Sequence, residues 1–322
     1  MDEVPQKFRE AVVALFNPKR WLRTHFSAFP DDLWQAALDR NKANRVEVTV
    51  LLRRVDNAWK YCFYVNGDAL SVEGLKDCMP NSEFVRVDYF EVQGQGYHQE
   101  EGETENEEMF PLTSSFQRLI TFIQPLVPAP TAVASNIHCE SPVLRIDGTF
   151  EASVAEEVGN SIARLHFADI RIENCPPAFD PILKTHFTSD RMLDRCTITL
   201  EKDSFSTMEL IRNHFRTTSA FSKLEIRSVH PLLTFADFQL IFDAIQRLNF
   251  FWDKVGDDFY VIFEGYFEKE AKESLETFRT DLDEGGNGYS PNLYIWRHDE
   301  DFSVRVYVWD LAQDMWEISI YH

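Results

Sequence analysis

One short pattern recurs four times between Leu144 and Leu248 and decides how the chain folds. Each copy is an apolar–polar–apolar triplet, followed by a stretch with helical periodicity. The four triplets are Leu144-Arg145-Ile146, Ile170-Arg171-Ile172, Ile198-Thr199-Leu200 and Leu224-Glu225-Ile226. They begin at positions 144, 170, 198 and 224, so successive copies are 26, 28 and 26 residues apart. A strand-plus-helix unit with this period is typical of a repeat that stacks its units side by side.

A strand, a helix and then another strand imply a crossover, so adjacent strands are parallel and the helices pack on one face of the sheet. We therefore expect an α/β fold whose centre is a leucine-rich-repeat-like parallel sheet with helices on one face. A small helical plus antiparallel β module precedes this sheet, and an antiparallel β meander ends it. The predicted domains are a helical segment (1–44), a β-rich module with an acidic loop at 94–108 (45–124), a βα repeat domain (136–280) and a C-terminal meander packed on the repeat sheet (289–322).

The N-terminal segment has the apolar spacing of an amphipathic helix between Phe8 and Phe16. Asn17-Pro18 ends that helix, because proline lacks a backbone donor and clashes with the preceding turn. A second helix begins near Asp31-Asp32, where carboxylates suit the positive end of the helix dipole.

From Arg45 the apolar period changes to two, which predicts a β-hairpin over 46–65 with its turn near Asp56-Asn57. A further strand fits 84–92, and 116–123 is apolar enough for either a helix or a strand. Pro125, Pro128 and Pro130 then mark a boundary before the repeats. Beyond the repeats we expect a strand at 259–263, a helix at 269–278 and three meander strands at 293–296, 302–309 and 315–321.

Helix starts inside the repeat region have their own chemistry. A hydroxyl three residues before a carboxylate is typical of a capping box, in which each side chain accepts from a backbone N–H at the other position. The pairs are Ser153 with Glu156, Ser206 with Glu209 and, in a shorter version, Thr234 with Asp237.

The charge balance limits the classes of partner that the chain can bind. The 53 acidic and 32 basic residues give a net charge of −21, which repels phosphate backbones and anionic membranes. We find no local basic cluster, and no apolar run approaches the ~18 residues that a membrane span needs. We therefore predict binding to proteins, to no nucleic acid and to no membrane.

The five cysteines are odd in number and scattered, and none forms a Cys-x-x-Cys pair. The acidic start Met1-Asp2-Glu3 lacks the layout of a signal peptide. Both features favour a reducing compartment, cytoplasmic or nuclear, in which the cysteines act as small core residues.

A search for catalytic spacing finds no His-Glu-x-x-His, no Gly-x-Ser-x-Gly and no Gly-x-Gly-x-x-Gly after a strand. His298 with its acidic neighbours 299–301 suggests a metal site, but a charged turn between strands explains these residues better. The glycines at 285–288 lack the Gly-Lys-Ser/Thr of a phosphate-binding loop. We predict no enzyme, no catalytic residue, no cofactor and no metal. An enzyme whose site is assembled from distant residues is the alternative.

The polar residues of the repeat strands offer a better-defined candidate. If the apolar residues of each triplet face the helices, the residues between them face outward. Arg145, Arg171, Thr199 and Glu225 then form one row across the sheet, and Asp147, Glu173, Glu201 and Arg227 form the next. We expect these eight residues to make a charged partner-binding face. An ordinary solvated sheet face is the alternative.

The opening of the chain resembles a divergent F-box, with Val4-Pro5 where an F-box has Leu-Pro and Trp34 where it has a later tryptophan. The layout of most of the chain also resembles the nematode families of F-box and F-box-associated proteins. This resemblance implies substrate recruitment to a cullin–RING ubiquitin ligase, with the repeats holding the substrate. The residues that would dock on the ligase adaptor through 1–44 are Pro5, Phe8, Val12, Leu15 and Phe16. Alternatively, this helix packs against the hairpin after Arg45, and the chain is a repeat-based scaffold unrelated to ubiquitin.

Overall fold

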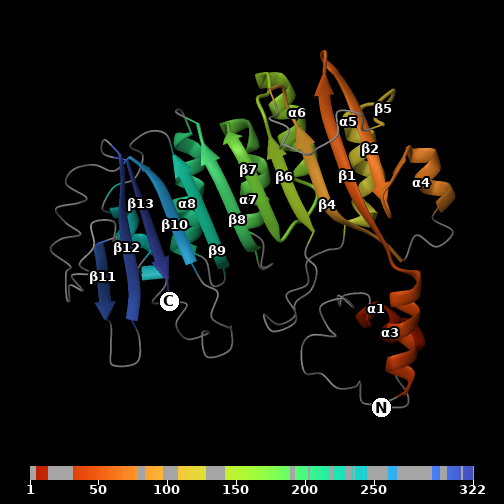
Figure 1. Cartoon of the computed structure of the whole chain (residues 1–322), viewed down its shortest axis with the longest axis horizontal. Helices are drawn as coiled ribbons and strands as arrows, with labels where there is room; N and C mark the ends of the chain where they lie inside the picture. Colours follow the sequence, from red (N-terminus) through yellow and green to blue (C-terminus); the bar gives the residue numbers. More distant parts are fainter. Residues whose placement is uncertain are drawn as a thin grey trace. The chain divides into compact units, whose positions relative to one another are not determined.

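The chain forms two compact units of the α/β class in a computed structural model (Figure 1). Unit 1 comprises residues 1–150 and 164–168, and unit 2 comprises 151–163 and 169–322. The division falls after Phe150, whereas the sequence predicted a boundary in the proline-rich stretch. The structure describes residues 5–13, 32–78, 84–96, 108–127, 142–188, 193–201, 204–217, 221–228, 234, 236–241, 243–244, 260–266, 292–297, 303–312 and 315–321.

Unit 1 contains a mixed sheet with the strand order β6-β4-β1-β2-β3, and β5 also pairs with β2. Its strands are β1 (Val46–Val55), β2 (Ala58–Val65), β3 (Asp68–Leu70), β4 (Val85–Gln93), β5 (Phe110–Pro111) and β6 (Val143–Asp147). The predicted hairpin is confirmed, because β1 and β2 are antiparallel and Asp56 and Asn57 turn between them with positive φ angles. The predicted antiparallel module is a mixed sheet, because β1, β2, β3 and β5 pair antiparallel whereas β4 runs parallel to both β1 and β6.

The apolar face of the unit 1 sheet packs against α5 (Phe116–Ile123), which is followed by the short helix η2 (Gln124–Leu126). Phe116 of α5 contacts the ring of Trp59, with 4.9 Å between the ring centroids. Four of the eight residues of α5 are buried, which resolves the ambiguity at 116–123 in favour of a helix. Helix α4 (Val72–Cys78) follows β3 and buries Leu75.

Among the described residues before β1 there are two helices, in agreement with the prediction. They are α1 (Gln6–Val13) and α3 (Asp32–Asn44), and they pack against each other. Ala37 and Leu38 form a small buried cluster with Trp34 at its edge. The predicted helix end at Asn17-Pro18 lies outside the described residues.

Unit 2 contains a sheet with the strand order β7-β8-β9-β10-β13-β12-β11. Its strands are β7 (Asp169–Cys175), β8 (Leu193–Leu200), β9 (Phe221–Ser228), β10 (Tyr260–Tyr266), β11 (Asn292–Arg297), β12 (Ser303–Ala312) and β13 (Met315–Tyr321). The strands from β7 to β10 are parallel. The last three form the predicted antiparallel meander, which continues the sheet because β13 pairs with β10.

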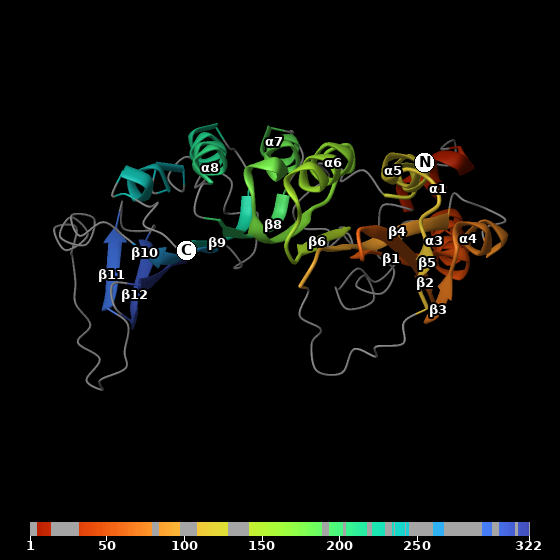
Figure 2. The same ribbon diagram turned by 90° about the horizontal axis from the view of Figure 1, so that it is seen from above.

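Helices cover one face of the parallel part of unit 2, as Figure 2 shows for α7 and α8 over β8 and β9. They are α6 (Ala152–Ile162), η3 (Pro177–Phe179), α7 (Asp180–Thr188) and α8 (Phe205–Thr217), and residues 236–241 are also helical. Ile182 of α7 and Ile211 and Phe215 of α8 are buried side chains of these helices, each at most 2% exposed. The predicted helix at 269–278 lies outside the described residues. Among the described residues, none of the helices has the length and apolar character needed to cross a bilayer.

Of the three predicted capping pairs, one is present in part, with the carboxylate of Asp237 bonding back to Thr234. Asp237 accepts hydrogen bonds from the backbone N–H of Thr234 at 2.7 Å and from its hydroxyl at 3.1 Å. The other two pairs are wrong, because α6 begins at Ala152 after Glu151, and α8 begins at Phe205 after Ser204. Ser153 and Ser206 therefore lie inside their helices. The hydroxyl of Ser204 instead donates to the carbonyl of Cys175.

Candidate partner-binding surface

The parallel strands of unit 2 have one apolar and one polar face. The apolar positions are at most 2% exposed and include Ile170, Ile172, Cys196, Ile198, Leu224, Ile226, Val261 and Phe263. Side chains alternate across a strand, so the residues between them point to the opposite face. We call the following set the polar sheet face: Asp169, Arg171, Arg195, Thr197, Thr199, Glu225, Arg227 and Glu264.

Glu225 is the centre of a lateral network on the polar sheet face. Its carboxylate accepts from Arg227 at 2.6 Å and from the hydroxyl of Thr197 at 3.5 Å, and Arg195 lies 3.8 Å away. The Glu225 side chain is only 11% exposed, so the three donors hold a carboxylate that is largely removed from water. The network joins β8 and β9 through side chains in addition to the backbone ladder.

Arg227 connects β9 to β10, because its Nε lies 3.2 Å from the Glu264 carboxylate. Partial burial works to lower the pKa of Arg227, but the carboxylates of Glu225, Glu264 and Glu173 outweigh it and raise the pKa. The Arg227 side chain is nevertheless 53% exposed. Its guanidinium is therefore fixed in position by two carboxylates while much of its surface is accessible to a partner.

Arg171 has its own partner on the same strand. It donates to both carboxylate oxygens of Asp169, at 2.8 and 3.2 Å. This paired geometry orients the planar guanidinium. The polar sheet face thus carries three arginines and three carboxylates, and Lys223 beside Arg195 adds a further positive charge, in a chain of net charge −21.

The predicted rows are correct for the strand face and wrong for the register. Arg171 lies beside Thr197, and Thr197 lies beside Glu225, so Thr197 takes the place predicted for Thr199. Thr199 lies beside Arg227 in the next row. The physical reason is that a shift by two residues keeps every side chain on its own face, so the apolar pattern cannot distinguish the two registers.

Two acidic residues of the predicted second row, Glu173 and Glu201, do not lie in that row in the structure. Glu173 is exposed at an irregularity of β7, where the register shifts between Ile172 and Cys175 and Asn174 has a φ of +52°. Glu201 is exposed and lies directly after the end of β8. Of the four residues predicted for the second row, Arg227 is thus the one that pairs regularly within a unit 2 strand, at its expected place on β9.

The remaining pair, Arg145 and Asp147, belongs to β6 of unit 1 and takes part in a polar network within that unit. Arg145 is 3.3 Å from Asp147 and 4.0 Å from Glu91 on β4. Glu91 accepts from the amide of Gln93 at 3.0 Å, and the Oε1 of Gln93 accepts from Arg53 on β1. This network crosses three strands, and its Gln93 is only 2% exposed.

The N-terminal docking residues are only partly described. Pro5 and Phe8 are exposed, with Phe8 at 56%. Val12 lies in α1, while Leu15 and Phe16 lie outside the described residues. The alternative in which Phe8 packs against the hairpin does not agree with this exposure.

Sequence reasoning missed Asp169, Arg195, Thr197 and Glu264, and it missed Arg53, Glu91 and Gln93 of the unit 1 network. Extending the period-two alternation beyond each triplet identifies all three residues on β7 and β8, because Asp169 and Thr197 lie two residues, and Arg195 four residues, before a predicted face position. No such signal exists for Glu91, because its position depends on the parallel pairing of β4 with β6.

No family model, curated protein or solved structure matches the chain. Among the residues that the structure describes, no group of three or more histidine, cysteine, aspartate or glutamate side chains is arranged to hold a metal ion. His298 and its acidic neighbours lie outside these residues.

Proposed function

We propose that the chain is a non-catalytic protein-binding protein whose polar sheet face is the contact surface for a partner. The observation that supports this proposal is the lateral network around Glu225, which fixes several charged groups on the side of the parallel strands opposite the described helices. Preorganised charges of both signs favour specific pairing and correct register with a complementary surface.

A finer proposal follows the resemblance to F-box proteins: the N-terminal helices dock on the adaptor of a cullin–RING ubiquitin ligase, and the polar sheet face holds the substrate. Phe8 on α1 and Leu33 on α3 support it, because they are large apolar side chains that are 56% and 49% exposed. Arg9 on α1 is buried, and its Nε and Nη1 have no hydrogen-bond partner among the described residues. A buried, unsatisfied guanidinium is costly, and a partner's carbonyl or carboxylate lowers that cost.

The polar sheet face is tested by reversing two of its charges in the full chain, with the double variant Arg171→Glu and Arg227→Glu. Proteins captured from cells by the wild-type chain are identified by quantitative mass spectrometry. We expect the double variant to lose a defined set of them by about tenfold or more, because like charges then oppose the partner's surface.

The matched control is Arg216→Glu on α8. Arg216 is 47% exposed, close to the 43% of Arg171, but it lies on a helix. The control is expected to capture the same set as the wild type. If the double variant is folded and captures that set equally well, the polar sheet face is not the contact surface.

The ligase proposal is tested separately by probing pull-downs for the adaptor. We expect the full chain to capture the adaptor, and both the double variant Phe8→Asp with Leu33→Asp and a chain lacking residues 1–44 to lose it. The Arg171→Glu and Arg227→Glu variant is expected to retain it. A folded full chain that does not capture the adaptor refutes the ligase role and leaves the scaffold role intact.

A further inference from the structure

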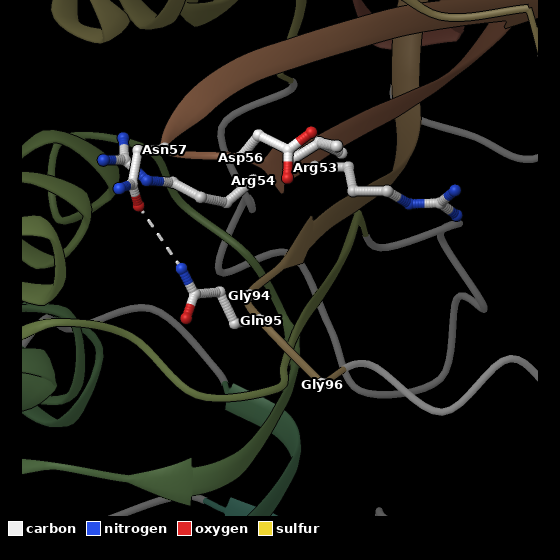
Figure 3. Close-up of a pocket in the computed structure, with 8 residues that line it drawn as sticks. Arg53, Arg54, Asp56, Asn57, Gly94, Gln95 and Gly96 are labelled. Carbon is white, nitrogen blue, oxygen red and sulfur yellow. Dashed lines mark hydrogen bonds between the residues drawn. The ribbon is translucent and has the colours of Figure 1, made fainter.

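A hollow of about 520 Å³ lies at one end of the unit 1 sheet, between the β1–β2 turn and the loop that follows β4 (Figure 3). It is lined by Arg53, Arg54, Val55, Asp56, Asn57, Gly94, Gln95 and Gly96. The adjacent strands β1 and β4 are parallel and both end here, and the carboxyl ends of parallel strands are where α/β sheets bind ligands. The volume lies within the range of small-molecule sites.

Cationic groups outnumber anionic ones around this hollow. Arg53 and Arg54 line it, and Lys60 lies directly opposite Arg53 in the β1–β2 ladder. Like charges in opposite positions repel each other. Among the described residues, no carboxylate lies within ion-pair distance of Arg54 or Lys60. Asp56 is the single acidic residue of the lining, in a chain with 53 acidic and 32 basic residues.

Arg54 is held ready for a ligand by an aromatic ring. Its guanidinium carbon lies 5.5 Å from the ring centroid of Trp59, the geometry of a cation–π contact. The indole Nε1–H of Trp59 is itself buried and has no acceptor among the described residues. Trp59 itself does not line the hollow, so its ring acts by holding the Arg54 guanidinium, whose donors an oxyanion with several lone pairs can satisfy.

The rest of the lining suits the neutral part of a ligand. The side-chain amide of Gln95 donates to that of Asn57 at 3.4 Å, so two amides from opposite sides meet across the hollow (Figure 3). Gly94 lets the loop approach the residues that follow β6 closely, since a Cβ there would lie 2.5 Å from the Thr149 carbonyl oxygen. The amides and the Asp56 carboxylate can accept from hydroxyl groups.

We propose that this hollow binds a small hydroxylated anion, with a phosphate or carboxylate group at Arg54 and hydroxyl groups toward Asn57, Asp56 and Gln95. The site lies in unit 1 and is independent of the polar sheet face, so either proposal can fail alone.

The test is a titration of the full chain followed by the indole N–H signals of its seven tryptophans in ¹⁵N-resolved NMR spectra, with the Trp59 signal assigned from Trp59→Phe. The probes are glucose 6-phosphate, inorganic phosphate and citrate, each at up to about 10 mM, ten times a millimolar Kd. Sodium chloride at matched ionic strength is the reference for screening.

We expect the Trp59 signal to shift with at least one probe, and Arg54→Gln to weaken that binding by about tenfold. Arg118→Gln, an exposed arginine on α5, is the matched control and is expected to leave the binding unchanged. A response to glucose 6-phosphate alone assigns a phosphorylated polyol, and a response to citrate alone assigns a carboxylate ligand. A Trp59 signal that does not move, or that moves equally in Arg54→Gln or with sodium chloride, overturns the proposal.

Discussion

At the scale of single residues, His214 on α8 is a buried titratable group that couples the stability of the fold to pH. It is 5% exposed and stacks on Phe187, with ring centroids 4.4 Å apart. Its Nδ1 lies 3.4 Å from the Phe187 carbonyl oxygen. Because a carbonyl only accepts hydrogen bonds, Nδ1 carries a proton and donates it in this contact. Burial lowers the pKa of His214 to about 4, although the hydrogen bond to Phe187 opposes this shift.

This shift predicts a loss of stability in mild acid. The unfolded chain takes up a proton at His214 below about pH 6.5, whereas the folded chain does so only near pH 4, so the free energy of unfolding falls as the pH decreases between these values. From pH 7 to pH 5 the loss due to His214 is about 2 kcal/mol. Urea unfolding at both pH values, in the wild type and in His214→Phe, measures it. The variant keeps an aromatic ring and removes the titration, so an equal pH dependence in the two proteins contradicts the assignment.

At the scale of elements, the packing of α6 against η3 depends on one glycine. A Cβ at Gly159 would lie 2.2 Å from the carbonyl oxygen of Ala178, so the helix can approach η3 this closely only without a side chain. Glycine inside a helix normally costs about 1 kcal/mol relative to alanine. Gly159 is therefore explained by the close contact between α6 and η3, which leaves no room for a side chain, and not by a preference of the helix for glycine.

Two helical glycines therefore respond oppositely to the same substitution. We expect Gly159→Ala to lower the free energy of unfolding by about 1–3 kcal/mol, because backbone must move to admit the methyl group. Gly74→Ala in α4, where the nearest atom would be an ordinary 3.5 Å away, is expected to be neutral or to add up to about 1 kcal/mol. Urea unfolding compares the two variants, and a Gly159→Ala protein as stable as Gly74→Ala would falsify this account of the helix packing.

The faces of the strands could be predicted from the sequence, but the register and the partner of some strands could not. The triplets identified β6, β7, β8 and β9 and the correct face of each, because local alternation determines which side chains are buried. The register of β8 was missed because Cys196, which is 0% exposed, is an apolar residue of this strand. It lies beside Ile170, at the place that the triplet pattern had assigned to Ile198. The place of β4 was missed because a parallel partner distant in the sequence leaves no local signal.

At the scale of the whole molecule, periodicity predicted the α/β class and the order of its parts, while the candidate sites could be located only from the fold. The polar sheet face combines residues from β7 to β10, and its central contact joins Glu225 to Arg195 and Arg227. The hollow in unit 1 combines the end of β1 with Gly94 and Gln95, which the sequence assigned to an acidic loop. In both places the chemistry depends on which strands are neighbours.

The most direct measurement of the central claim is carboxylate labelling of the full chain, alone and bound to the partner that capture identifies. The label reacts with accessible aspartates and glutamates, and mass spectrometry reports its extent at each one. We predict that binding reduces labelling at Glu173 and Glu264, beside and on the polar sheet face, while the exposed Glu156 and Glu157 of α6 remain labelled. Protection of Glu156 and Glu157 with unchanged labelling of Glu173 and Glu264 would contradict the claim that the polar sheet face binds the partner.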